Sequence, residues 1–195
     1  PPPPPLPPAP AITSAAELIP ADLDVVVRLD IGRVKGALGD LALTAIADQA
    51  LARDSAGQEP EELLITSLLA AEVVYLAYRP SPSWTPLDRV LALQGRFEQL
   101  VRPPKAFSGA TDLGRDARYW DAKSPVARGG VARIYSFGER VRAFVSEAEL
   151  DAVERTLDGL GSSRRLQPPE EGMLSLAARP RLVVIWMTPL AAAVP

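Results

Sequence analysis

The stretch VARIYSFGERVRAFVSEAELDAVERTLDG, residues 131–159, decides the fold that we expect for this chain. Residues 131–137 and 140–145 are rich in β-branched and aromatic side chains, and Gly138 and Glu139 separate them. Glycine tolerates positive φ at the first position of a type II′ turn, so the pattern predicts a β-hairpin with a two-residue loop. The second strand alternates between two faces, one of which carries Val141, Ala143 and Val145.

A helix is predicted to follow this hairpin directly. Ser146 and Glu149 have the spacing of a capping box, in which each side chain accepts a hydrogen bond from an otherwise unpaired backbone N–H. Val145 and Leu150 occupy the two positions of a hydrophobic staple, and Gly159 stands where a left-handed cap is expected. This strand–turn–strand–helix unit indicates a scaffold and carries no chemistry.

Similar patterns outline the rest of the chain. Further strands are predicted over residues 22–31, 72–78, 89–94, 106–111, 118–121, 174–178 and 182–187, and helices over residues 33–53, 60–70 and 97–101. Runs of strands outnumber strand–helix alternations, which predicts an α+β domain with a mainly antiparallel sheet of about five or six strands and helices on one face. We expect this domain to span residues 13–167, with residues 168–195 adding strands that could begin a truncated second half.

The composition excludes several classes of site. The 195 residues include no cysteine and no histidine, which rules out disulfides, thiolate nucleophiles, Cys/His zinc sites and Ser-His-Asp triads. The formal net charge is −3, but it is unevenly distributed. Residues 17–88 hold 5 basic and 12 acidic side chains, whereas residues 89–142 hold 11 basic and 5 acidic ones. This polarity along the chain predicts a basic face.

Proline dominates the beginning of the chain. Eight of the first ten residues are proline, so residues 1–12 are expected to form an extended spacer outside the fold. Such a run at the start of a chain without an initiating methionine suits a mature secreted domain held away from a membrane or wall. No membrane span is predicted, because the apolar run from Leu182 is far shorter than the roughly 20 residues that a spanning helix needs.

The last predicted strand, LVVIWM over residues 182–187, is apolar on both faces. A strand of this kind belongs inside a sheet or between two layers, and an exposed hydrophobic edge favours aggregation. We therefore expect it to be paired or covered by the earlier strands, by a missing C-terminal portion, or by a second copy. The last two options predict that the chain is part of a longer protein or of a tightly held assembly.

Three acidic pairs are the candidate groups of a carboxylate-based hydrolase: Asp22 with Asp24, Glu61 with Glu62, and Glu170 with Glu171. Each pair also has a simpler interpretation, as a strand start, a complement to a helix dipole, or a loop. The only glycine cluster is Gly32, Gly36 and Gly39, and its spacing does not match a dinucleotide or phosphate loop. We therefore predict no catalytic, cofactor-binding or metal-binding residue.

The basic segment, residues 89–142, interleaves arginine with aromatic residues. On a sheet face this pattern suits single-stranded nucleic acid, but it equally fits a solvated face on which arginine stems cover apolar surface. No RNP-type signature is present, so nucleic acid is the weaker alternative. The candidate partner surface combines residues of this segment with the last tryptophan: Arg115, Arg118, Tyr119, Trp120, Arg133, Tyr135, Arg142 and Trp186.

Three phrases, ELIPADLDVVVRLDIGRVKGALG, RVLALQGRF and VRAFVSEAELDAVERTLDG, resemble uncharacterised secreted, lipoprotein-type proteins of the bacterial cell envelope. The resemblance covers residues 17–159. It implies a ferredoxin-like α+β fold and a periplasmic or outer-membrane-anchored location, with a cytoplasmic location still open. It brings no site residue and no ligand.

These observations predict a non-enzymatic binding or assembly module of the bacterial envelope, with a protein partner or a second copy of the chain. The alternatives are a carboxylate-based hydrolase and a single-stranded nucleic-acid binder that uses residues 89–142.

Overall fold

The computed structural model describes residues 11–39, 59–79, 88–100, 104–124, 126, 130–161 and 183–187. Its strands are β1 (Val25–Asp30), β2 (Ala71–Tyr78), β3 (Arg89–Gly95), β4 (Thr111–Gly114), β5 (Ala117–Asp121), β6 (Val131–Phe137), β7 (Val141–Ser146) and β8 (Val183–Met187). Its helices are α1 (Ile31–Leu38), α3 (Glu59–Ala70) and α4 (Leu150–Gly161), with the short 3₁₀ helices η1 (Ala15–Leu18) and η2 (Glu147–Glu149).

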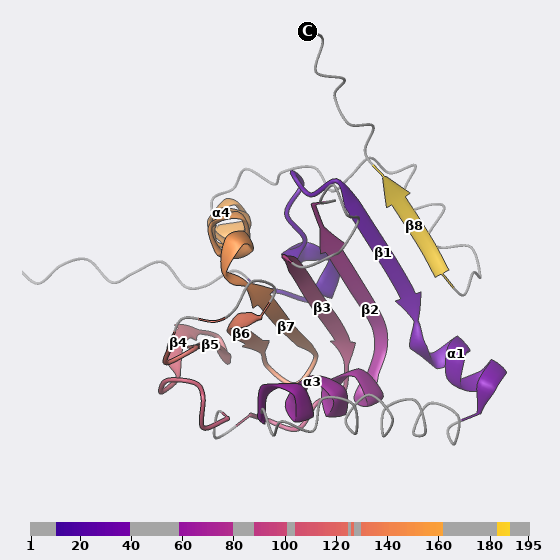
Figure 1. Ribbon diagram of the computed structural model, residues 1–195, viewed down its shortest axis with the longest axis horizontal. Helices are drawn as coiled ribbons and strands as arrows, with labels where there is room; N and C mark the ends of the chain where they lie inside the picture. The colour runs from indigo at the N-terminus through magenta and orange to yellow at the C-terminus, as the bar shows by residue number, and fades with distance from the viewer. Residues whose placement is uncertain are drawn as a thin grey trace, which may run out of the picture.

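All eight strands form one sheet in the order β4-β5-β6-β7-β3-β2-β1-β8, and every neighbouring pair is antiparallel (Figure 1). The α+β class with an antiparallel sheet is therefore confirmed. The sheet has more strands than predicted, because the short β4 and the distant β8 extend it at its two ends.

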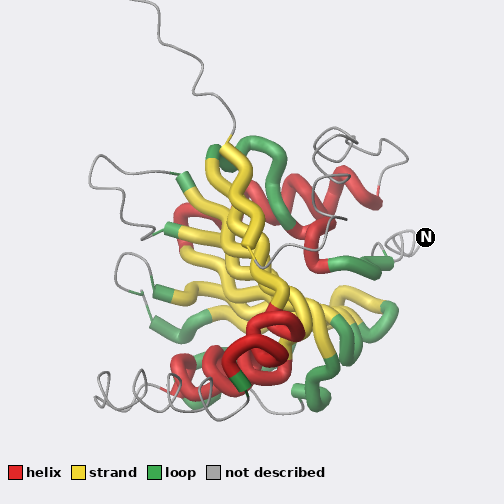
Figure 2. The backbone as a smooth tube through the Cα atoms, turned by 90° about the vertical axis from the view of Figure 1, so that its right-hand side faces the viewer, coloured by secondary structure: helices red, strands yellow, loops and turns green. Residues whose placement is uncertain are grey.

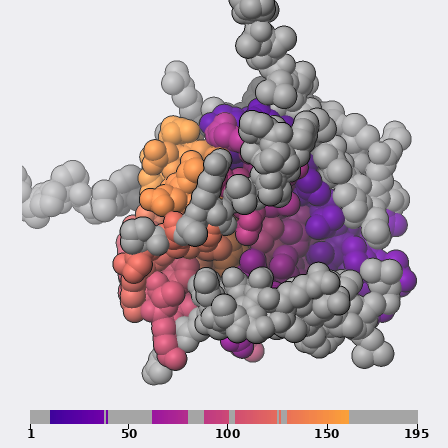
Figure 3. Space-filling view, viewed as in Figure 1, coloured from indigo at the N-terminus to yellow at the C-terminus, as the bar shows by residue number. Residues whose placement is uncertain are grey.

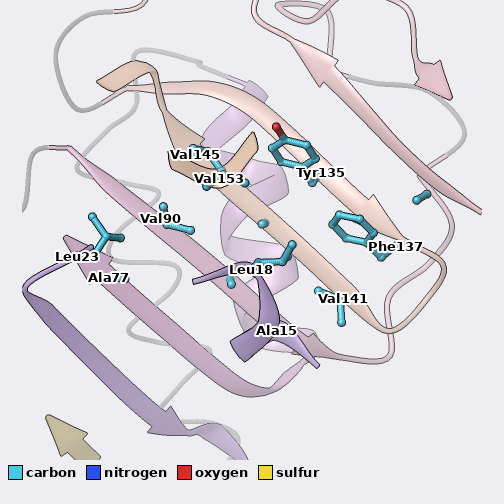
Figure 4. Close-up of a cluster of buried hydrophobic side chains, with 13 residues drawn as sticks. Ala15, Leu18, Leu23, Ala77, Val90, Tyr135, Phe137, Val141, Val145 and Val153 are labelled. Atoms are coloured by element: carbon cyan, nitrogen blue, oxygen red, sulfur yellow. The ribbon is translucent and has the colours of Figure 1, made fainter. Parts of the chain in front are cut away.

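Helices cover both faces of the sheet, which corrects the expectation of helices on one face (Figure 2). On one side, which we call the α4 face, Val153 of α4 and Leu18 of η1 pack on the strands around Tyr135 (Figure 4). On the other side, the α3 face, leucines of α3 pack on a cluster that includes Trp120 and Phe144. Both faces need cover because the central strands are apolar on both sides, and every residue of β7 is buried.

The predicted hairpin and helix form, but their junctions differ from the prediction. Phe137 pairs with Val141, so the loop has three residues, and Gly138 adopts the expected positive φ of 56°. The capping box does not form. Ser146 is the N-cap residue without a side-chain capping bond, and its hydroxyl oxygen instead accepts a hydrogen bond from the backbone N–H of Arg89 at 3.1 Å.

The helix following the hairpin also begins and ends differently. Glu149 turns away from the helix start and pairs with the side chain of Arg79, and the first turn is the 3₁₀ helix η2. A charge-assisted bond to a guanidinium is stronger than a bond to a neutral backbone N–H, which explains the exchange. The staple residues Val145 and Leu150 both join the α4-face cluster. Helix α4 passes through Gly159 and ends at Gly161.

Two other predicted elements differ. The part of residues 97–101 that the structure describes is not helical, because the N–H of Phe97 donates to the carbonyl of Glu139 at 2.9 Å and the chain continues along the β6–β7 hairpin. Of the strand predicted over residues 106–111, only Thr111 lies in a strand. Phe107 makes an isolated bridge to Ala122, and β4 begins only at Thr111.

The strands predicted over residues 72–78, 89–94 and 118–121 correspond to β2, β3 and β5, and the helix over residues 60–70 corresponds to α3. The helix predicted over residues 33–53 is described only as far as α1, where Gly39 is the C-cap residue with a φ of 79°. The proline run, the rest of that helix and the predicted strand 174–178 lie outside the described residues. Within the described ranges, no helix combines the length and apolar character that a membrane crossing requires.

Candidate functional site

The structure separates the residues that the sequence suggested as a partner surface. Tyr119, Arg133 and Tyr135 lie together on the α4 face, where the two tyrosine rings are 5.7 Å apart. Strand alternation places Arg118, Trp120 and Arg142 on the α3 face. Arg115 lies in the β4–β5 turn, and Trp186 lies in β8 at the opposite end of the sheet. Only the first three residues form a cluster.

Arg133 is the centre of this cluster. Its guanidinium donates hydrogen bonds to Asp121, Tyr135 and Glu154 and lies 4.2 Å from the ring centroid of Tyr119. Burial would lower the pKa of Arg133, but the hydrogen bonds, that to Asp121 foremost, outweigh it and raise this pKa. The side chain thus ties β5, β6 and α4 together, and its charge is neutralised within the fold.

Arg142 has the opposite environment on the α3 face. It donates to the hydroxyl of Ser67 and to the carbonyl of Glu98, both at 2.8 Å, and lies over the ring of Phe97 at 5.0 Å. Its Nε has no hydrogen-bond partner, and burial lowers the pKa of this guanidinium. Phe97 and Glu98 also line an open depression of about 450 Å³, together with Arg96, Gln99 and Glu139.

The depression does not make Arg142 an anion site. The unpartnered Nε is itself buried, and Glu98 and Glu139 bring negative charge to the rim. An anion would meet these carboxylates before the guanidinium, so the arrangement disfavours it. The geometry instead supports a structural role, in which Arg142 joins α3 and the segment after β3 to β7.

The third charged group is a set of ion pairs around Arg79, which the sequence did not suggest. Arg79, at the end of β2, binds Asp22 at 2.9 Å and Glu149 at 3.2 Å, and Arg155 lies 3.5 Å from Asp22. Burial raises the pKa of Glu149, and Arg79 offsets this effect only in part. Burial also acts to raise the pKa of Asp22, but the hydrogen bond and charge of Arg79 outweigh it and lower this pKa.

Two carboxylates with oppositely shifted pKa values are a pattern found in acid–base catalysis. Here Arg79 binds both of them, and the side chain of Glu149 is only 2% exposed, so a substrate could not reach it. The arrangement supports an ion-pair tie between the start of β1, the end of β2 and η2. The only local sequence signal was a glutamate at a cap position, because its partner lies 70 residues earlier in the chain.

The β4 end of the sheet is short and irregular. Strand β4 has four residues and a register shift between Asp112 and Gly114. Arg115 and Asp116 form the tight turn to β5 with positive φ values of 52° and 61°. A short, bulged and charged edge strand is a poor template for another strand, so this edge is protected.

The β8 end is different. All five residues of β8 pair with β1 without a register shift, and none of them is charged or proline. Within the described parts of the chain, no strand pairs with the other side of β8. Five of the six residues of β1 are only half-buried, although strands flank it on both sides. Figure 3 shows atoms of the N-terminal strands at the surface.

For the strand predicted over residues 182–187, we expected pairing with earlier strands, with a missing C-terminal portion or with a second copy. The structure shows pairing with an earlier strand on one side, because β8 pairs with β1. Among the described residues, no strand pairs with its other side. We take this side of β8, with the adjoining half-buried residues of β1, as the candidate functional site and call it the open edge.

Comparisons with known proteins give a likeness of fold. No protein family and no curated protein match the sequence. The structure is similar to crystal form IV of TP0453, with a TM-score of 0.55 and 11% identity over 91% of this chain and 65% of that chain. It is also similar to crystal form I of TP0453, with a TM-score of 0.53 and 10% identity over 91% of this chain and 64% of that chain. This chain thus spans slightly less than two thirds of those chains, and at such identity the likeness concerns the fold alone.

Proposed function

We propose that the chain is a non-enzymatic binding or assembly module of the bacterial cell envelope, and that the open edge accepts a partner strand. The observation that carries this proposal is the regular, uncharged strand β8 with one side unpaired among the described residues. Strand addition to such an edge gains main-chain hydrogen bonds along its length, and the side chains on both faces add specificity.

The non-enzymatic part of the proposal is supported by what the charged side chains do. Arg133, Arg142 and the group around Arg79 are each engaged with other elements of the fold. Catalysis by carboxylates requires a pair that faces a substrate across an accessible cavity. The buried Glu149, held by Arg79, suits an ion-pair tie better than that role.

The envelope location rests on the resemblance of the three sequence phrases, and the ferredoxin-like arrangement stays a prediction. The two alternatives gain no specific support from the described residues. Two arginines that a nucleic-acid platform would use, Arg133 and Arg142, point to opposite faces of the sheet and are engaged there.

A site-specific cross-linking experiment tests the proposal. A photoreactive benzoylphenylalanine would replace Ile185 in β8 or, as the matched control, Asp112 in β4, and the variants would be irradiated in the native bacterium. We expect a covalent adduct of defined mass in the envelope fraction from position 185 and none from position 112. No adduct from position 185, or equal adducts from both positions, would contradict the proposal.

A further inference from the structure

We propose that the strand added at the open edge is β8 of a second copy of this chain, antiparallel to the first across a two-fold axis perpendicular to the sheet. This inference rests on the proposed function and names its partner. The result would be one continuous sheet, with β1 and β8 of one protomer followed by β8 and β1 of its partner.

The composition of β8 suits pairing with itself. Val183–Met187 reads VVIWM, so every register of two such strands sets apolar residues against apolar residues and brings no like charges together. Directly opposed like charges destabilise a strand pair. The β4 edge, with the sequence TDLG, would bring Asp112 close to its own copy. Self-pairing is therefore favourable at one end of the sheet and unfavourable at the other.

The topology also suits a two-fold partner. All neighbouring strands of the sheet are antiparallel, and a two-fold rotation of β8 adds a further antiparallel neighbour. Two-fold dimers, in which the same patch is used twice, are the commonest protein oligomers. The formal net charge of −3 per copy opposes association only weakly, because it is screened at physiological salt.

The surface beside β8 still has apolar area to bury. Val26, Val27 and Leu29 of β1 are half-buried, whereas every residue of β7 at the centre of the sheet is buried. Pairing across the open edge would bring together the apolar ends of two sheets. Burial of apolar area of this kind is the main driving force for association.

The symmetry makes a sharp geometric prediction. A two-fold axis perpendicular to the sheet keeps each side chain on its own face, and directly opposed residues of two strands share a face. One residue of the new strand pair must therefore lie opposite its own copy. Its two neighbours in sequence are offset from their own copies by two residues, about 7 Å along the strand, which puts their Cα atoms beyond the reach of a disulfide.

A cysteine scan tests this prediction cleanly, because the chain has no cysteine of its own. Each residue of Val183–Met187 would be replaced singly by cysteine and the variants oxidised, with Asp112→Cys as the control on β4. We expect a covalent dimer with one sharp maximum in the scan and none from the control. In reducing buffer, sedimentation should show a dimer that Ile185→Lys weakens at least about tenfold, since a charge at the pair is left without a partner.

The outcomes separate the inference from the proposed function. A monomer in which the β8 amides directed away from β1 exchange rapidly has an open edge, but its occupant is another protein, which overturns the inference alone. A monomer in which these amides are protected has its edge covered within the chain, which overturns both. Equal cross-linking at every position indicates unspecific aggregation and also overturns the inference. The cysteine variants keep the test valid if Ile185→Lys does not fold.

Discussion

The two ends of the sheet differ in how they stop. At the β4 end, the edge strand is four residues long, has a register shift and turns through two residues with positive φ. At the β8 end, the edge strand is regular, uncharged and next to a half-buried β1. Native proteins protect edges with short strands, bulges and charges. One end has these features, and the described part of the other end lacks them, which is the contrast on which the proposed partner site rests.

The burial of side chains also differs between the two ends, and it is more complete near β4. Behind β4, Trp120 is fully buried on one face, and Arg133 ties β5, β6 and α4 together on the other. At the β8 end, Tyr75 and Val26 remain half-buried on the face that η1 and α4 cover farther along.

Residues near the β4 end of the sheet should contribute most to stability. Trp120→Ala removes a fully buried indole and should lower the free energy of unfolding by about 3–5 kcal/mol. Tyr75→Ala, a matched aromatic change toward the open end, should cost only about 1–2 kcal/mol because its ring is half-buried. Urea unfolding measures both. Equal losses would mean that the two ends are packed alike.

Arg142, which is buried, and Arg133, which is half-buried, should respond differently to an apolar replacement. Arg133→Met leaves Asp121, Glu154 and the Tyr135 hydroxyl without their partner, and we expect a loss of about 2 kcal/mol. Arg142→Met removes a buried cation that makes no hydrogen bond to a carboxylate among the described residues, so we expect a change within about 1 kcal/mol.

Arg142→Ala is the control for volume, and it should cost about 2–4 kcal/mol because it also removes the packing on Phe97. The same urea titrations serve for all three variants. A larger loss for Arg142→Met than for Arg133→Met would reverse our assignment of the two roles.

The tie at Arg79 should show itself in the pH dependence of stability. Because burial raises the folded-state pKa of Glu149 above its ordinary value of 4.5, the folded protein binds its proton more tightly than the unfolded chain does. The stability that this group contributes is therefore full below that value and is lost as the pH rises through the raised pKa. Glu149→Gln lacks this loss, so wild type should lose stability relative to the variant as the pH rises above 4.5.

Unfolding free energies of both proteins at several pH values measure this difference. Asp22, whose pKa is lowered, contributes stability that is lost as the pH falls, but it is present in both proteins. A difference that stays constant with pH would show that Arg79 balances burial at Glu149, and one that changes in the other direction would show that Arg79 outweighs burial.

The smallest effect concerns the β4–β5 turn. Arg115 and Asp116 both have positive φ, which costs glycine least, asparagine and aspartate more, and arginine more still. The double change Arg115→Asn and Asp116→Gly matches the preference of this type of turn and should stabilise the protein by about 1 kcal/mol. A thermal melt measures the gain. Sedimentation should remain unchanged, and a change in association would mean that the β4 edge also binds a partner.

Patterns local in sequence predicted much of this fold. The alternation and turn residues of the hairpin, and the periodicity of α4, depend on neighbours in the chain and were found from them. The capping box was wrong because Glu149 prefers a guanidinium 70 residues away in sequence, which no local pattern reveals. The cover on both faces was missed for a similar reason, since it depends on which strands become central in the sheet.

The candidate site was predictable only in part. The sequence indicated that its last strand needed pairing, and Trp186 of β8 was among the residues suggested for a partner surface. The arginine and tyrosine residues were suggested by their type alone. Arginine and aromatic residues serve equally well in contacts within a fold and in contacts with a partner, so composition could not separate these roles.

Amide hydrogen exchange, measured residue by residue by NMR, tests most directly whether the far side of β8 is open. In an edge strand, alternate N–H groups point toward the neighbouring strand and away from it. At low protein concentration, we predict that the amides of β8 directed to β1 are protected and the alternate ones exchange rapidly. The second set should become protected as the concentration rises and the second copy binds. Protection of all five amides at every concentration, or of none, would contradict an open edge that pairs with a second copy.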